Sequence, residues 1–227
     1  MSYKILNLYA CLGGNRYKWN EVREDIEVTA VELDPEAARL YQERFPNDKV
    51  IVADAHKYLL DHYKEFDFIW SSPPCPTHSR TNHFLNAQGH IRYPDMKLYE
   101  EIVFLKTFFK GKYVVENVIP YYTPLIIAKE RHRHLYWTNF NLPNVLSDRK
   151  SPNMSVQKSG REKYGNDVVG RFSKFHDYDF KKYKGTQARK KMALNLVDYE
   201  AGRTILETAL GIEKQQNVNQ ISIFDAI

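Results

Sequence analysis

Residues 3–14 have the sequence YKILNLYACLGG, and this stretch decides the fold. Its first eight residues are a near-continuous apolar run, as in a strand that is covered on both faces of a sheet. The run ends at Gly13-Gly14, and a glycine pair in this position lets the backbone turn tightly and approach a ligand closely. We therefore expect a buried strand over residues 3–10, which leads into a turn at a ligand-binding edge.

The following residues repeat this pattern of strand and helix. Asp34-Pro35-Glu36 suits a helix start, because aspartate caps the N-terminus and proline fits the first helical position. A helix is also expected near residues 56–63, and another over residues 95–109. The predicted strands are residues 3–10, 27–33, 49–53, 66–71, 112–118 and 134–140. This alternation predicts an α/β fold with a mostly parallel sheet, whose carboxyl ends gather at one edge.

The composition is that of an ordinary globular protein. The chain has 227 residues, of which 43% are hydrophobic and 27% charged. No apolar run approaches the ~18 residues that cross a bilayer, and the N-terminal segment lacks the apolar core of a signal peptide. Two cysteines, Cys11 and Cys75, give no disulfide framework. We expect a cytoplasmic monomer without a membrane partner.

Positive charge is concentrated late in the chain. Residues 147–191 contain thirteen Lys and Arg against five Asp and Glu, a balance of +8 in a chain whose net charge is +5. A basic run alone is more often a solvated loop. This one is interleaved with Tyr164, Phe172, Phe175, Tyr178, Phe180 and Tyr183. Aromatic rings among basic residues favour a nucleic-acid partner. We predict a core over residues 1–140, a small basic lobe over residues 141–186, and a helical segment over residues 187–227 that returns to the core.

Two acidic residues follow the early strands. Glu32 ends the second predicted strand eighteen residues after Gly14, where an acid in a nucleotide-binding sheet accepts hydrogen bonds from ribose hydroxyls. Asp54 ends the third and could accept a hydrogen bond from an adenine amino group. Each acid alone is more often a helix cap or a surface charge. Together with the glycine turn they point to an adenosyl cofactor.

Residues 71–79, SSPPCPTHS, present a cysteine. A buried free cysteine usually behaves as a small hydrophobe. The prolines around Cys75 fix the backbone, and the polar neighbours favour presentation of the thiol rather than packing. A thiolate in this position is a nucleophile.

Residues 114–120, VVENVIP, place Glu116 at the end of an apolar strand. A partly desolvated carboxyl group there could donate as well as accept a hydrogen bond, although a paired structural carboxylate is the alternative. Residues 131–134, RHRH, would by themselves indicate a basic turn.

Taken together and in this order, the motifs resemble the cytosine-5 DNA methyltransferase family. The matching segments are LYACLGG (8–14), VELD (31–34), ADA (53–55), SPPCPTHS (72–79), ENV (116–118), RHRHLYWTN (131–139) and NLVDYEAG (195–202). The RHLYWTN form is most similar to phage or mobile-element members. The resemblance implies the cytoplasm of a bacterium or a phage-infected host, and a role in restriction-modification or self-protection of a mobile genome.

The resemblance also implies a fold, a cofactor and a catalytic set. The expected fold is α/β, Rossmann-like and of the S-adenosylmethionine-dependent methyltransferase type, with a small target-recognition lobe. Cys75 would attack carbon 6 of the target cytosine, Glu116 would bind ring nitrogen 3 and the exocyclic amine, and Arg133 would steady the pyrimidine carbonyl. No metal is implied.

The same resemblance assigns binding residues. S-adenosyl-L-methionine would be held by Tyr9, Cys11, Leu12, Gly13, Gly14, Glu32, Leu33, Asp54, Ala55, Pro74 and Asn195. Double-stranded DNA would be contacted by Ser79, Arg80, Asn117, Arg131, Lys158, Arg161, Lys163 and Arg171.

The chain departs from the family pattern in three places, and three alternatives stay open. Cys11 and Leu194 stand where the family has glycine, and the arginine motif fits either Arg131/Arg133 or His132/His134. The alternatives are a tRNA cytosine-5 methyltransferase, an enzyme that transfers a larger group from a modified S-adenosylmethionine, and a catalytically silent DNA-binding module.

Overall fold

The computed structural model describes residues 2–143, 149–152 and 168–212. Its strands are β1 (Tyr3–Leu8), β2 (Ile26–Glu32), β3 (Lys49–Val52), β4 (Phe68–Ser71), β5 (Lys112–Val118), β6 (Lys129–Arg131) and β7 (His134–Thr138). Its α-helices are α1 (Trp19–Val22), α2 (Pro35–Arg44), α3 (Ala55–His62), α4 (Asn82–Ala87), α5 (Lys97–Phe108), α6 (Val168–His176), α7 (Arg189–Asn195) and α8 (Tyr199–Ala209). Two 3₁₀ helices are η1 (Tyr63–Glu65) and η2 (Phe180–Lys182).

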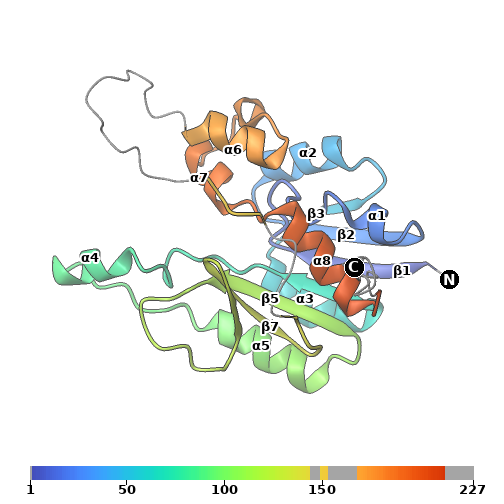
Figure 1. Ribbon diagram of the computed structural model, residues 1–227, viewed down its shortest axis with the longest axis horizontal. Helices are drawn as coiled ribbons and strands as arrows, with labels where there is room; N and C mark the ends of the chain where they lie inside the picture. The colour runs from blue at the N-terminus through green and yellow to red at the C-terminus, as the bar shows by residue number, and fades with distance from the viewer. Residues whose placement is uncertain (1, 144–148, 153–167, 213–227) are drawn as a thin grey trace, which may run out of the picture.

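The strands form a seven-stranded sheet in the order β3-β2-β1-β4-β5-β7-β6 (Figure 1). Strands β1 to β5 are parallel, whereas β7 runs antiparallel to both β5 and β6. This is a Rossmann-like α/β sheet, and it confirms the fold class predicted from the alternation of apolar strands and helices.

The sheet is covered on both faces because adjacent strand residues point to opposite sides. In β1, Leu6 and Leu8 pack with α3 and α5, whereas Ile5 packs with α1 and α8. In β5, Val115 faces the first cluster and Val114 the second. The near-continuous apolar runs of the sequence therefore reflect burial on both faces.

Capping residues set the helix starts. Asp34 caps α2 by accepting hydrogen bonds from the backbone of Glu36 and Ala37, as predicted. The helix predicted over residues 95–109 is α5, for which Met96 is the N-cap and Asp95 accepts a hydrogen bond from Lys97 N. The helices α1, α4 and α6 and the strand β6 were not predicted. Helices α1 and α4 and strand β6 are too short to show an apolar period, whereas α6 buries Val168, Phe172 and His176 at a helical spacing of four, which was a usable signal.

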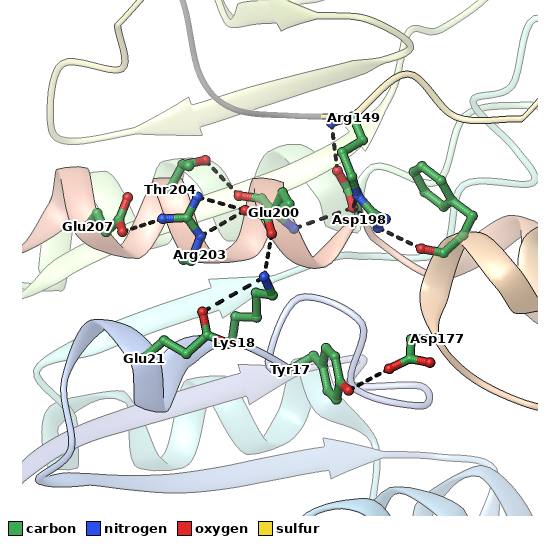
Figure 2. Close-up of polar contacts among 11 residues, drawn as sticks. Tyr17, Lys18, Glu21, Arg149, Asp177, Asp198, Glu200, Arg203, Thr204 and Glu207 are labelled. Carbon is green, nitrogen blue, oxygen red and sulfur yellow. Dashed lines mark hydrogen bonds and ion pairs between the residues drawn. The ribbon is translucent and has the colours of Figure 1, made fainter. Parts of the chain in front are cut away.

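The described part of the late basic segment packs on the core. Phe172, Phe180 and Met192 share one buried cluster with Leu12 and Leu40. Polar contacts add to this attachment (Figure 2): Tyr17 Oη donates to Asp177, and Lys18 Nζ lies 2.6 Å from Glu200 Oε1. Residues 144–148 and 153–167 of the predicted lobe over residues 141–186 lie outside the described residues, so its boundaries stay a prediction.

Helix α8 lies tightly against the turn after β1, and one glycine permits this approach. A Cβ atom on Gly202 would lie 2.0 Å from the backbone oxygen of Asn15. The indole N–H of Trp19 also donates to the Gly202 oxygen at 3.2 Å. Both contacts join the last described helix to the first turn of the chain.

We predict that Gly202→Ala destabilises the protein by roughly 1–3 kcal/mol, as overpacking does. In an unhindered helix the same substitution would stabilise by about 1 kcal/mol. The free energy of unfolding from urea titration measures the difference. Thr208→Ala on the same helix is the control, with an expected change within about 0.5 kcal/mol. A Gly202→Ala protein that is as stable as the wild type would contradict the close contact.

Candidate active site

A cavity of about 1310 Å³ opens at the carboxyl edge of the sheet. Its walls come from the turns after β1, β2, β3, β4 and β5, from the β6–β7 turn, and from residues 185–197. The predicted catalytic and cofactor residues that line it are Tyr9, Cys11, Gly14, Glu32, Leu33, Asp54, Ala55, Pro74, Cys75, Glu116, Arg133 and Asn195.

Glu32 connects two turns at one side of this cavity. Its carboxylate accepts hydrogen bonds from Cys11 N and Asp34 N, both at 2.8 Å. Burial raises the pKa of Glu32. Each carboxylate oxygen has a second acceptor position, so Glu32 can hold the turn and still accept a ligand hydroxyl.

The neighbouring residues offer a surface that suits an adenine ring. Leu33 is 68% exposed although it is apolar, and it lines the cavity. Asp54 caps α3 by accepting a hydrogen bond from Lys57 N at 3.1 Å, and this contact lowers the pKa of Asp54. An ionised Asp54 only accepts hydrogen bonds, as recognition of an amino group requires. Cap and ligand contact are therefore compatible.

The turn after β1 differs from the expectation in its glycines. Gly13 has φ +69° and a Cβ atom there would meet the rings of Phe45 and Tyr41, while a Cβ on Gly14 would lie 2.3 Å from Val197 O. Both glycines therefore permit close contacts within the protein. Gly14 also lines the cavity, whereas Gly13 and the buried Leu12 are not among its lining residues. Their contact with a cofactor stays a prediction.

Cys11 adopts φ +48°, a left-handed conformation that favours glycine. Cys11 is partly buried, and burial together with the negative charge of Glu32 raises the pKa of its thiol to about 12. The Cys11 thiol is therefore protonated at neutral pH, and the residue lines the cavity.

The loop after β4 presents Cys75. Asn117 Nδ2 donates to Pro73 O at 2.9 Å, and the backbone of His78 and Ser79 donates to Cys75 O, each at 3.0 Å. The prolines and these hydrogen bonds fix the loop, so the thiol lies on a rigid support at the cavity wall. Asn117 uses its side-chain amide to hold this loop and also lines the cavity, and its contact with nucleic acid stays a prediction.

Glu116 lies two residues before the end of β5, and its side chain is almost completely buried. His134 Nε2 lies 3.6 Å from Glu116 Oε1. Arg131 is turned away, since its guanidinium donates to Pro143 O at 3.1 Å. Of the two possible registers of the arginine motif, the geometry favours His132/His134, with Arg133 also at the cavity.

The electrostatic environment keeps the Cys75 thiol protonated. Burial raises the pKa of Cys75, and the negative charge of Glu116 raises it further. Lys191 of α7 acts in the opposite direction. Its contribution was missed in the sequence because α7 lies far from Cys75 along the chain. A nucleophilic role thus requires that a ligand or a proton acceptor favour the thiolate.

The remaining predicted nucleic-acid residues are scattered. Ser79 and Arg80 line the cavity, whereas Arg131 and Arg171 do not. Lys158, Arg161 and Lys163 lie outside the described residues. Lys191 lines the cavity and was not singled out from the sequence. Exposed cations on and between η2 and α7 were not singled out either: Lys181, Lys182, Lys184, Arg189 and Lys190. Within the described part of the chain, no group of three or more His, Cys, Asp or Glu residues could hold a metal ion.

We predict that Cys75 reacts slowly with iodoacetamide at pH 7 and that Glu116→Gln accelerates the reaction. Removing the nearby negative charge lowers the pKa of the thiol and increases the thiolate fraction. Alkylation rates between pH 6 and 10, followed by mass spectrometry of the Cys75 peptide, measure this effect.

The Cys11 peptide is the internal control, because its protonated thiol should remain unmodified in both proteins. Glu207→Gln on the far helix α8 should leave the alkylation of Cys75 unchanged. If Glu116→Gln shifted the pH profile of Cys75 upward or not at all, the two side chains would not be coupled as described.

Parts of the chain are similar to known proteins. The chain is 33% identical over 89 residues to a tRNA (cytosine(38)-C(5))-methyltransferase from Spodoptera frugiperda. The aligned region covers 38% of this chain and 27% of the relative. Among solved structures, a mutant of Spodoptera frugiperda DNMT2 is similar at 26% identity, with a TM-score of 0.37. The match covers 52% of this chain and 36% of the DNMT2 chain. A putative DNA modification methyltransferase from an E. coli prophage matches 54% and 34% at 20% identity, with a TM-score of 0.37. The chain thus spans less than two fifths of the length of these relatives.

The family comparison covers more of the chain. The family model described as C-5 cytosine-specific DNA methylase matches residues 3–120. That region contains β1 to β5, the Cys75 loop and Glu116. Since the match extends over more than half of the 227 residues, the protein belongs to the C-5 cytosine-specific DNA methylase family.

Proposed function

We propose that the protein transfers a methyl group from S-adenosylmethionine to carbon 5 of a cytosine that is flipped out of double-stranded DNA, through a covalent adduct with Cys75. Membership of the family implies S-adenosylmethionine as the donor and a nucleic acid as the acceptor. The observation that carries the proposal is the shared cavity in which a presented thiol, a buried carboxyl group and an adenosine-compatible wall face one another.

The size of the cavity suits two ligands. Pockets for one small ligand usually measure about 300–1,000 Å³, and this cavity is larger, at about 1310 Å³. Tyr9, Glu32, Leu33 and Asp54 line the part that would hold the cofactor. Cys75, Glu116 and His134 line the part that would receive a base. A stacked base cannot reach this depth, so the nucleotide must leave the helix at a cost of a few kcal/mol.

The chemistry follows from these side chains. The Cys75 sulfur bonds to carbon 6 of cytosine, and the electron pair of the 5,6 double bond moves toward carbon 5. Glu116 hydrogen-bonds ring nitrogen 3 and so stabilises the charge that develops in the ring. S-adenosylmethionine, when bound, supplies an electrophilic methyl group. Once carbon 5 carries the methyl group, water takes the carbon-5 proton, the electron pair of that C–H bond re-forms the 5,6 double bond, and the sulfur–carbon bond breaks to return the thiolate of Cys75.

Charge on two sides of the cavity supports a nucleic-acid acceptor. Residues 180–197 of η2 and α7 contain six Lys and Arg and no acidic residue. The segment over residues 79–94 is also free of acidic residues, carries Arg80 and Arg92, and exposes Phe84 and Tyr93. Figure 1 shows α4 of this segment and α7 at the same end of the molecule, on opposite sides of the sheet edge. A polyanion between them would contact both.

Two parts of the proposal rest on the sequence and on its relatives rather than on the cavity. The RHLYWTN segment (133–139 region) supports a phage or mobile-element enzyme that serves in restriction-modification or genome protection. The tRNA enzyme among the relatives favours RNA as the second candidate substrate.

The described residues contain no helix that is long and apolar enough to span a membrane.

We predict that Cys75→Ala abolishes methyl transfer but binds S-adenosylmethionine as the wild type does, because the thiol acts on the base. Transfer is measured on duplex DNA and on tRNA by mass spectrometry of the nucleosides, and cofactor binding by calorimetry. The wild type should also form a covalent adduct with duplex DNA that contains 5-fluorocytosine, and Cys75→Ala should not.

Each alternative has its own outcome in this experiment. Methylation of tRNA alone would replace DNA as the substrate, and a product heavier than 5-methylcytosine would indicate a larger transferred group. A wild-type protein that binds DNA and never forms the adduct would be a silent module. Cys11→Ala is the matched cysteine control and should keep the adduct.

We predict that replacing Lys181, Lys182 and Lys190 by Gln weakens DNA binding and lowers its salt dependence. The slope of log affinity against log salt should fall by about one for each lysine that contacts a phosphate. The control replaces Lys106 and Lys110, which are exposed on and just after α5, far from the cavity in sequence and fold. Equal slopes for wild type and the three-lysine variant would remove η2 and α7 from the interface.

A further inference from the structure

A buried carboxylate below the cavity has no part in the chemistry above. Glu101 of α5 is 0% exposed. Tyr9 Oη and Ser71 Oγ each donate to it at 2.6 Å, and His56 Nδ1 lies 3.0 Å away. Burial of a charged carboxylate is costly unless hydrogen bonds compensate for the lost water, and here all three neighbours can donate.

The three partners come from three different elements. Tyr9 follows β1 with φ +55° and lines the cavity, as does His56 in the first turn of α3. Ser71 is the last residue of β4, four positions before Cys75. Glu101 Oε1 contacts the two residues of the cofactor side, and Oε2 contacts the residue that leads to the nucleophile. One side chain therefore joins both halves of the cavity.

We propose that Glu101 is a positioning residue. It fixes the positions of Tyr9 and His56 on the cofactor side relative to the Cys75 loop. This inference rests on the proposed function of the cavity. Glu101 does not touch a ligand itself. It acts through Tyr9 and His56 on the cofactor site, and through Ser71 on the presentation of the thiol.

Charge supports the pairing of Glu101 with His56. The hydrogen bond to Glu101 raises the pKa of His56. The other charged groups that act on the imidazole are Glu100 and Lys97 of α5 and Asp54 before α3. His56 Nε2 lies 3.5 Å from Glu100 Oε1. An imidazolium beside Glu101 is therefore retained to higher pH than that of an ordinary histidine, and the contribution of this pair is lost as pH rises through the raised pKa.

Single substitutions should separate the two halves. Tyr9→Phe removes one donor on the cofactor side and should weaken S-adenosylmethionine binding several-fold, with the alkylation rate of Cys75 unchanged. Ser71→Ala should change the alkylation rate of Cys75 and leave cofactor affinity unchanged. Glu101→Gln sets an amide N–H against a donor. It should alter both the cofactor affinity and the alkylation rate of Cys75, with a loss of cofactor affinity of about tenfold.

The measurements are the dissociation constant of S-adenosylmethionine by calorimetry and the alkylation of Cys75 by mass spectrometry, each from pH 6 to 9. Neither uses a nucleic acid, so the result stands apart from the outcome of the transfer assay. In the wild type, cofactor affinity should fall as pH rises through the pKa of His56, and Glu101→Gln should flatten this dependence.

Asp48→Asn is the control, because it disturbs another buried ion pair, with Arg16 at 2.8 Å, outside the cavity. It should lower the melting temperature and leave both measurements unchanged. The proposal is overturned if Glu101→Gln changes only the melting temperature, or if Tyr9→Phe and Ser71→Ala each change both measurements alike. If Glu101→Gln does not fold, the proposal is tested by the other two variants. It holds if Tyr9→Phe changes only the cofactor affinity and Ser71→Ala changes only the alkylation rate of Cys75.

Discussion

The structure depends on the parallel register of β1 to β5, which brings the carboxyl ends of five strands to one edge. Residues in the last part of these strands, or just after it, are separated along the chain and meet in one cavity: Cys11, Glu32, Asp54, Cys75 and Glu116. Antiparallel pairing would send alternate ends to the opposite edge. The seventh strand is antiparallel, and the turn before it still brings His132 and Arg133 to the same edge.

The predictable part of the molecule is the part whose signals are local. Apolar runs marked the strands of the sheet, and Asp34 marked the start of α2 because a cap acts through its own backbone neighbours. The cavity residues after each strand followed from the topology. Whether a glycine contacts ligand or protein was not predictable, because Gly13 and Gly14 are constrained by Phe45 and Val197, which lie elsewhere in the chain.

The residues missed in the sequence were missed for different reasons. Glu101 lies in a helix beside Glu100, where a solvated pair of acids is the common outcome. Its spacing of three after Leu98 and four before Leu105 places it on the buried side of α5, which was a usable signal. The proximity of His134 to Glu116 depends on the pairing of β5 with β7, and such a pairing leaves no local trace. The predicted nucleic-acid contacts at Lys158, Arg161 and Lys163 lie outside the described residues, and exposed cations on η2 and α7 were not singled out.

The contact between Gly14 and Val197 has a consequence for the order in which the protein becomes functional. Synthesis delivers the N-terminal strands first, and with them the residues of the strand ends. The wall that residues 185–197 contribute is absent until nearly the whole described chain has emerged from the ribosome. A growing chain therefore carries Cys75 and Glu116 long before the cavity around them is complete, and early binding of a ligand there is disfavoured by the architecture itself.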